Sequence, residues 1–300
     1  MKPHPNTSAV PTHPGPAFVA ADDLFLPSGL DARAFIVKSD KDGLWEKTLV
    51  VHFPQRRRSL STNDGIVDVL AVANHAAHST LWHAAGPAMT NHDGLLAKVY
   101  AKTIQEKIAQ RLHVKADDVT MMGTSADMDN LAVVTKAFTP FVVTALVTAG
   151  AKGNAIRTGV DEGKYIEPDP AFEKALSGDS PVPGTVNILI LTNARLTDGA
   201  MARTIITATE AKTAAFEDLR VPSSYTKDVQ ATGTGTDSMI VVSGTTGPAV
   251  TYSGGHSQIG ELMGKAVHEA VMEALEKQNG FKRRDVVPAV EPFPQSSVQA

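Results

Sequence analysis

The sequence predicts an α+β protein with α/β-type layers, in which a mixed or antiparallel sheet is covered by long helices. Strand-like segments precede helical segments in pairs rather than in strict alternation, which disfavours a purely parallel sheet. Aromatic residues make up only 5% of the chain, so aliphatic residues and Met must fill the core, a bias that suits helices packed on a sheet. A four-layer αββα sandwich is one arrangement that fits this pattern.

Length and composition predict one globular domain with a tail at each end. The chain has 300 residues, of which 42% are hydrophobic and 20% charged, and this is enough to bury a sizeable core. We assign residues 31–280 to the domain, 1–30 to a disordered Pro-rich tail and 281–300 to a C-terminal tail. The first 21 residues hold five prolines and no apolar run typical of a signal peptide.

In the first part of the domain, the residue pattern predicts a hairpin and an amphipathic helix. Two β-branched runs within residues 34–53 flank a turn at 40–43, which favours a hairpin. Residues 66–77 are apolar without strict alternation, so helix and strand compete there. Apolar residues recur at helical spacing from Leu95 to Leu112 and predict a helix.

The middle of the chain predicts short strands and one exposed excursion. Residues 119–122 and 132–134 are strand-like, and the β-branched run at 141–147 completes a hairpin that turns at Thr139-Pro140. Residues 165–183 contain four prolines, and we interpret them as an excursion or lid.

The last part predicts a buried strand between two long helices. Residues 186–191 form a continuous apolar run, typical of a central strand. Thr197 or Asp198 caps a helix that continues to about Leu219. A strand at 238–242 follows, and an apolar stripe predicts the last helix over 258–277.

Charge and cysteine content exclude several classes of function. The net charge is −4 and the only dense basic run is Arg56–Arg58, which we interpret as a solvated loop, so nucleic acid binding is disfavoured. Cysteine is absent, which excludes thiol catalysis, disulfides and thiolate metal sites. No run of about 18 apolar residues supports a membrane span, and the cytoplasm is the default location.

Residues 231–237, with the sequence ATGTGTD, form the densest polar cluster of the domain. Gly233 and Gly235 let backbone amides approach a ligand closely, and Asp237 adds a carboxylate just before a predicted strand. The loop lacks the lysine of a P-loop and the spacing of a dinucleotide fingerprint. A plain Gly-rich turn explains the motif equally well.

Lys212 points with the apolar face of the helix that follows Thr197. At about 100° per residue it shares a stripe with Met201 and Ala208, whereas Glu210 lies on the opposite, solvated side. A lysine whose stem lies along apolar surface accounts for this position. The functional alternative is a lysine aimed into a site, where it serves proton transfer or stabilises an oxyanion.

His256 precedes the last helix within the sequence SGGHS. Free amides at a helix start and a titratable imidazole suit a developing oxyanion and a departing amine, although a lone His is more often structural. Glu261 lies one turn into the helix, where it faces His256 or pairs with Lys265.

His75, His78, His83 and His92 raise the question of a metal site. His75 and His78 share a face only if their segment is helical, and no HExxH pattern completes a zinc site. We therefore predict no metal and no cofactor.

Thr185 and Asn187 lie at the mouth of the predicted buried strand, on the same side by alternation. A threonine that follows a glycine is a candidate nucleophile, even one freed by self-cleavage as in N-terminal-nucleophile hydrolases. An ordinary strand start explains the same residues, and we favour it.

Several segments, taken in order, resemble the adenosylcobinamide amidohydrolase family. The likeness spans roughly residues 59–275 and rests on TAG at 148–150 with Asn154-Ala155, GTVNI at 184–188, TEAK at 209–212, residues 232–237, and GH at 255–256 with GEL at 260–262.

The resemblance implies hydrolysis of the aminopropanol amide of adenosylcobinamide, giving adenosylcobyric acid and aminopropanol, a salvage step towards coenzyme B12. The corrinoid is then the substrate rather than a cofactor. The alternatives are a non-enzymatic corrinoid-binding protein, an amidase with a threonine nucleophile that acts on another amide, and a metal-dependent amidase. The sequence leaves open whether the protein forms a homo-oligomer.

Chemistry assigns provisional roles to the candidate residues. We predict Asp237 or His256 as the general base, and Lys212 as an oxyanion stabiliser together with the amides of Gly233 and Gly235. The predicted substrate-binding residues are Asn154, Thr185, Asn187, Glu210, Thr232, Gly233, Gly235 and Glu261.

Overall fold

The computed structural model describes residues 20–41, 43–78, 80–81, 95–163, 165–166, 173–174 and 184–283. These residues form a mixed α+β structure built on one large curled sheet. The strands of this sheet are β1 (Ala20–Leu24), β2 (Arg33–Lys41), β3 (Leu44–Ser61), β4 (Gly65–Ala77), β5 (Val119–Thr124), β6 (Ala132–Phe138), β7 (Phe141–Ala149), β10 (Val186–Thr192) and β12 (Ser238–Val242).

Long helices and short pairs of strands complete the fold. The helices are α3 (Leu95–Leu112), α4 (Asp198–Asp218) and α5 (Gln258–Asn279). The short strands are β8 (Tyr165–Ile166), β9 (Glu173–Lys174), β11 (Arg195–Leu196) and β13 (Ala249–Val250), which pair as β8 with β9 and β11 with β13.

The sheet is mixed, as the sequence predicts. Its order is β1-β2-β3-β12-β10-β7-β6, and β4 pairs with the other edge of β3 and with β5. The β10/β12 and β4/β5 pairs are parallel, whereas the remaining pairs are antiparallel. Two residue runs that we predicted as hairpins are confirmed, namely β2 with β3 and β6 with β7.

Strand β3 belongs to both halves of the curled sheet. Its first part pairs with β2 and its last three residues pair with β12, while β4 follows it along the opposite edge. The register with β4 shifts between His52 and Arg57, where Pro54 lacks the amide that a regular ladder needs. Such irregularities bend a strand and increase its twist, so this point turns one half of the sheet towards the other.

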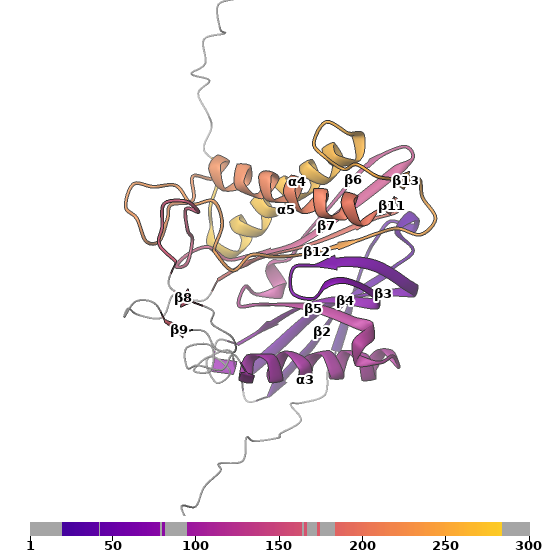
Figure 1. Cartoon of the computed structure of the whole chain (residues 1–300). Helices are drawn as coiled ribbons and strands as arrows, with labels where there is room; N and C mark the ends of the chain where they lie inside the picture. Colours follow the sequence, from indigo (N-terminus) through magenta and orange to yellow (C-terminus); the bar gives the residue numbers. More distant parts are fainter. Residues whose placement is uncertain are drawn as a thin grey trace, which may run out of the picture.

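Three apolar clusters show that the layers follow the order αββα (Figure 1). The first lies between α4 and α5 and the outer face of β6, β7, β10 and β12. The second lies between the two halves of the sheet, where Leu49 and Val72 meet Leu189 and Ile240. The third lies between α3 and the far half, around Ile104 and Ile108. The four-layer arrangement that the sequence left as one alternative is the one observed.

Residue patterning predicted most elements; of three further segments, one was left open, one differs and one lies mostly outside the described residues. Residues 66–77, where helix and strand competed, form β4, because both of its faces are covered and strict alternation is lost. β1 lies within residues 1–30, which we assigned to a disordered tail; its backbone pairs with β2, and its exposed Asp22 and Asp23 gave no apolar signal. Most of the predicted excursion at 165–183 lies outside the described residues.

The solvated loop predicted at Arg56–Arg58 is wrong, because these residues lie within β3. Strand alternation turns Arg57 inward, where it is 2% exposed, and leaves its neighbours outward. Arg58 pairs with Asp198 at 2.6 Å. Because residues 56–58 are all arginine, the sequence shows no alternation of apolar and polar residues here, and the strand could not be recognised from it. No helix of the described residues is long and apolar enough to cross a membrane.

Candidate active site

Polar side chains gather at one end of the sheet, where β7 ends and β10 and β12 begin. β10 and β12 are parallel and start side by side, with Asn187 opposite Ser238, and the antiparallel β7 ends next to the start of β10. The loops that precede β10 and β12 therefore lie next to each other at this end of the sheet. This topology brings together residues that are far apart in sequence, including Asn154, Thr185, Lys212 and Asp237.

Lys212 and Asp237 form a buried ion pair at this end. The ammonium donates to Oδ2 of Asp237, and the two side chains are only 8% and 12% exposed. Asp237 lies on the helix-facing side of its strand by alternation with Met239 and Val241, so it meets Lys212 from α4. The prediction that Lys212 points with the apolar face is confirmed by its 6% exposure.

The other lone pairs of Asp237 are occupied by its own loop and by β10. Oδ1 accepts from the Val186 amide at 3.2 Å, from the Thr234 amide at 3.2 Å and from the Thr234 hydroxyl. The carboxylate thus ties three segments together: α4, the Gly-rich loop and the start of β10. Its geometry is that of an anchor, which holds Lys212 and the first amide of β10 in place.

Gly233 leaves the room that the ion pair occupies. A Cβ atom at this position would lie 2.5 Å from Nζ of Lys212 and would also overlap Oδ2 of Asp237. The Gly233 carbonyl accepts from the Ile156 amide at 2.8 Å, which fixes the loop against residues 154–156. Gly235 has φ +75° and faces the Ile156 side chain, a conformation that favours glycine. Thr232 accepts from the Thr158 amide at 3.0 Å and supports the same contact.

Asn154 and Thr236 meet around the Gly184 carbonyl. Nδ2 of Asn154 donates to this carbonyl, and the Thr236 hydroxyl donates to it at 3.1 Å. The Thr185 hydroxyl in turn donates to the Thr236 carbonyl at 2.7 Å. Asn154 is 5% exposed, and its Oδ1 has no hydrogen-bond partner within the described ranges.

Asn187 faces the inner core, on the opposite side of the sheet from Asp237. Its Nδ2 donates to Oδ1 of Asn74 at 2.8 Å and to the Gly123 carbonyl at 3.0 Å, and Asn74 donates to Thr148 at 2.8 Å. Oδ1 of Asn187 is buried, and no group of the described residues bonds to it. Sequence reasoning missed Asn74 and Thr148. The signal was an Asn inside an apolar strand-like run, which a buried sheet tolerates only when its amide is paired.

A cavity of about 240 Å³ opens next to the Gly184 carbonyl. It lies between the ends of β5 and β7, the start of β10 and the end of α5. Its lining residues are Ser125, Ala126, Gly150, Lys152, Gly184, Gln278 and Asn279. A substrate group in this cavity would lie beside Gly184, which connects it with Asn154 and Thr185.

The family model of adenosylcobinamide amidohydrolases matches residues 34–283 of this chain. The chain belongs to the adenosylcobinamide amidohydrolase family. The match covers the curled sheet except β1 and the first residue of β2, all three long helices and every predicted site residue. The resemblance found in the sequence motifs is thereby confirmed.

Two further similarities accompany the family match. An uncharacterized protein of Methanocaldococcus jannaschii is 44% identical over 248 residues, which cover 80% of this chain and 91% of that protein. The crystal structure of a protein from Pyrococcus horikoshii OT3 is similar with a TM-score of 0.36 and 13% identity, over 77% of this chain and 78% of that one.

His256 and Glu210 of this amidohydrolase-family chain lie apart from the ion pair. Within the described residues, no hydrogen bond or ion pair joins His256 to Lys212 or Asp237, and His256 is exposed. The neighbouring Ser253 bonds to Thr204 at 2.9 Å, and Thr204 precedes Lys212 by about 12 Å along the axis of α4. Glu210 is exposed, as its position on the helix indicated.

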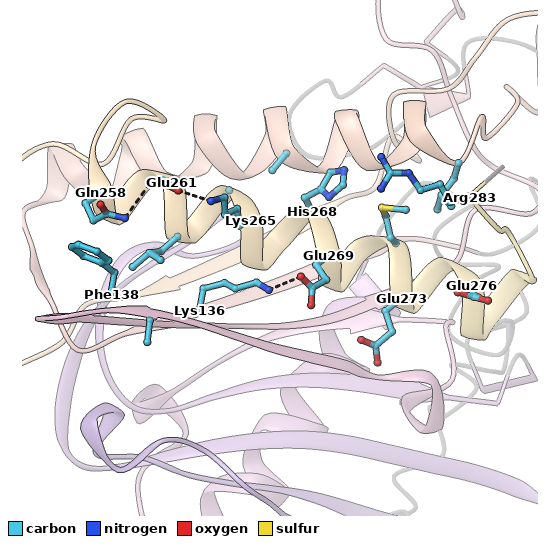
Figure 2. Close-up of a pocket in the computed structure, with 16 residues that line it drawn as sticks. Lys136, Phe138, Gln258, Glu261, Lys265, His268, Glu269, Glu273, Glu276 and Arg283 are labelled. Atoms are coloured by element: carbon cyan, nitrogen blue, oxygen red, sulfur yellow. Dashed lines mark hydrogen bonds and ion pairs between the residues drawn. The ribbon is translucent and has the colours of Figure 1, made fainter. Parts of the chain in front are cut away.

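Glu261 lies on the exposed face of α5, where it accepts from Lys265 at 2.5 Å and from Gln258 at 3.0 Å (Figure 2). Of the two partners considered for it, Lys265 is the one observed. These residues line an open groove of about 970 Å³ between α5 and β6. Lys136 pairs with Glu269 in the same groove. Both lysines of the groove are thus paired with glutamates, and neither Lys212 nor Asp237 is among its lining residues.

The histidine pair considered as a metal site does not form as envisaged, because the segment is a strand. His75 is fully buried in β4 and bonds to the Thr48 hydroxyl at 2.8 Å and to the Tyr100 hydroxyl at 2.9 Å. His83 and His92 lie outside the described residues. Among the described residues, no three His, Asp or Glu side chains gather as metal ligands would.

Proposed function

We propose that this protein hydrolyses the aminopropanol amide of adenosylcobinamide and releases adenosylcobyric acid and aminopropanol. The family match supports the reaction, and the structural observation that supports its location is the buried Lys212–Asp237 pair, whose carboxylate accepts from the Val186 amide two residues after Gly184. The corrinoid is the substrate in this proposal, and the ring side chain that carries the amide enters the cavity next to Gly184.

Amide hydrolysis requires donors for a developing oxyanion, and this end of the sheet supplies several. Lys212 carries a positive charge that is largely shielded from solvent, where electrostatic interactions are stronger than in water. Asn154 donates to the carbonyl of Gly184, a residue that lines the cavity. We propose that Lys212 and Asn154 bind the acyl side of the substrate, and that Asp237 positions Lys212.

The remaining residues that we predicted to bind substrate lie in different surroundings, and we propose different roles for them. Thr232, Gly233 and Gly235 shape the loop that holds the ion pair, and we propose that they act through it. Asn187 is fully buried and bonded to Asn74, and we propose that it supports the start of β10 from the inner core. His256 and Glu261 lie elsewhere on the surface, so their roles are the first to be tested.

The reaction is tested by incubating the purified full chain with adenosylcobinamide and measuring both products by mass spectrometry. We expect time-dependent release of aminopropanol with an equal amount of adenosylcobyric acid. Lys212→Ala and Asn154→Ala should lose at least about 100-fold in rate, the cost of removing one oxyanion donor. Lys136→Ala removes a partly exposed lysine on another face of the protein and serves as the matched control.

Two outcomes would contradict the proposal. Binding of cobinamide without release of aminopropanol would indicate a corrinoid-binding protein instead of an enzyme. Full activity in folded Lys212→Ala and Asn154→Ala variants would show that hydrolysis takes place elsewhere on the protein. His256→Ala, tested alongside, separates a general base from an exposed loop histidine.

A further inference from the structure

We propose that the chain cleaves its own peptide bond between Gly184 and Thr185, and that the freed Thr185 is the nucleophile of the amidohydrolase. The contacts around this bond are those that an acyl shift requires: a hydroxyl directly after the bond and two donors on its carbonyl. The self-cleavage stands on these contacts alone, whereas the role towards cobinamide rests on the proposed function.

The Gly184 carbonyl sits in an oxyanion hole. A backbone carbonyl is usually satisfied by backbone amides, but this one accepts from two side chains, Nδ2 of Asn154 and Oγ1 of Thr236. Two donors aimed at one carbonyl oxygen are the arrangement that stabilises a tetrahedral intermediate in acyl transfer. The Oδ1 atom of Asn154 has no partner among the described residues, so the contact with Gly184 is what orients its carboxamide.

The Thr185 hydroxyl belongs to the residue directly after that carbonyl and is held by one hydrogen bond. The Oγ1 proton points to the Thr236 carbonyl at 2.7 Å, which leaves the oxygen lone pairs free of that contact. Its own carbonyl accepts from the Gly150 amide at 2.9 Å, and the next amide, of Val186, donates to Asp237 at 3.2 Å. The residue after the bond is thus fixed from both sides.

The residue before the bond has to be glycine. A Cβ atom at position 184 would lie 2.6 Å from Oδ1 of Asn154 and 2.6 Å from the Gly150 carbonyl. A side chain at position 184 would therefore displace the Asn154 carboxamide. The Gly-Thr sequence, which by itself is an ordinary strand start, is enclosed by the groups that would act on it.

The chemistry balances with water as the only co-reactant. The Thr185 oxygen bonds to the Gly184 carbonyl carbon, the bond from that carbon to the Thr185 nitrogen breaks, and the hydroxyl proton passes to the nitrogen. An ester now joins Gly184 to the Thr185 side chain, beside a free α-amino group. Water hydrolyses the ester and leaves a carboxylate on Gly184 and the restored Thr185 hydroxyl. The exposed Thr236 side chain lies at this point, so solvent reaches the bond.

The cleaved site would then serve the substrate. Departure of Gly184 frees Asn154 and Thr236 to bind the substrate carbonyl, and the new α-amine is the base for its own hydroxyl, as in threonine nucleophiles at a chain terminus. Attack by Thr185 on the aminopropanol amide releases the amine and leaves an ester, which water hydrolyses to the acid. The Lys212–Asp237 pair, one residue away, fixes the strand that carries the nucleophile.

The two fragments would remain together after cleavage. β10 and β12 of the second fragment lie between β7 and β3 of the first, and α5 packs on β7. Separation therefore requires denaturation, and the native protein keeps its size. The cut would show only when the chains are unfolded.

Intact-mass measurement of the purified full chain under denaturing conditions tests the cleavage directly. We expect two fragments, residues 1–184 and 185–300, together heavier than the unbroken chain by one water molecule. Thr185→Ala should remain unbroken, Asn154→Ala should be cut more slowly, and Thr185→Ser should still be cut. Thr192→Ala, the same change at the far end of β10, is the control and should be cut as the wild type is.

Each outcome separates this inference from the proposed function. A single unbroken chain that hydrolyses adenosylcobinamide overturns self-cleavage and leaves the function standing. A cut chain that releases no aminopropanol supports self-cleavage and overturns the function. Cleavage in folded Thr185→Ala, with thermal melting as the check on folding, would exclude Thr185 as the attacking residue.

Discussion

Nε2 of His75 lies 2.9 Å from the hydroxyl of Tyr100, beneath helix α3. The same hydroxyl donates to Oε1 of Glu46 at 2.8 Å, so in this contact Tyr100 accepts from His75. His75 is therefore neutral with its proton on Nε2, and Nδ1 accepts from the Thr48 hydroxyl at 2.8 Å. This chain of hydrogen bonds ties β3 and β4 to α3.

The protein should lose stability below about pH 6.5 through His75. Burial lowers the pKa of His75 from 6.5 to about 4, so the folded protein keeps it neutral while the unfolded chain takes up a proton. Its contribution is complete above pH 6.5 and is lost as the pH falls towards 4, by up to about 1.4 kcal/mol per pH unit. Urea denaturation from pH 4 to 8 measures the free energy of unfolding at each pH. In the His75→Gln variant this free energy should depend less on pH than in the wild type. Equal slopes in both proteins would refute it.

Gly233→Ala should abolish most of the activity while leaving the fold intact. The added methyl would occupy the space of the Lys212 ammonium, and a displacement of about 1 Å costs on the order of 100-fold in rate. Release of aminopropanol is the measurement. Gly255→Ala is the control, because a Cβ atom there meets no other atom within 4 Å. Equal activity in the two variants would contradict the packing argument.

Removing one partner of the Lys212–Asp237 pair should destabilise the protein more than replacing both. Lys212→Met leaves Asp237 as an uncompensated charge that is 12% exposed, at a cost of about 3–5 kcal/mol in the free energy of unfolding. The double variant Lys212→Met/Asp237→Asn should recover part of this loss. A double-mutant cycle from urea denaturation gives the coupling, and strict additivity would show that the two groups do not interact.

Arg57→Ala should be far more damaging than Arg58→Ala. The buried guanidinium of Arg57 donates to the Leu30 carbonyl and to Thr245 at 3.2 Å, and it lies over the Phe53 ring. Its loss leaves buried acceptors unpaired and should cost about 3 kcal/mol. Arg58 is exposed, and its removal should leave the melting temperature close to that of the wild type. Similar shifts for both variants would count against this contrast.

Local patterns predicted the elements better than the contacts between them. The helical stripe placed Lys212 towards the core and the Gly-rich loop singled out Asp237, because each signal lies within one segment. Their pairing depends on β10 and β12 starting side by side, which is a long-range property. The Arg run and Asn74 were missed for a related reason: a buried polar group is recognisable only when its partners on other strands are known.

Thr185 illustrates the same limit at the candidate site. The sequence showed a threonine after a glycine, for which an ordinary strand start was the better explanation. Its surroundings come from residues 31 positions earlier, at Asn154, and 51 positions later, at Thr236. Segments so far apart in sequence leave no periodic pattern that could reveal their contact. Only the folded structure shows that Asn154 and Thr236 surround the Gly184 carbonyl.

The continuity of β3 has a consequence for how this protein opens. Strand β3, with 18 residues, forms part of both the half covered by α3 and the half covered by α4 and α5. Local unfolding of either half would therefore break backbone hydrogen bonds of β3 that also hold the other half together. We therefore expect a single melting transition, and the paired amide protons of β3 should be among the last to exchange with deuterated solvent.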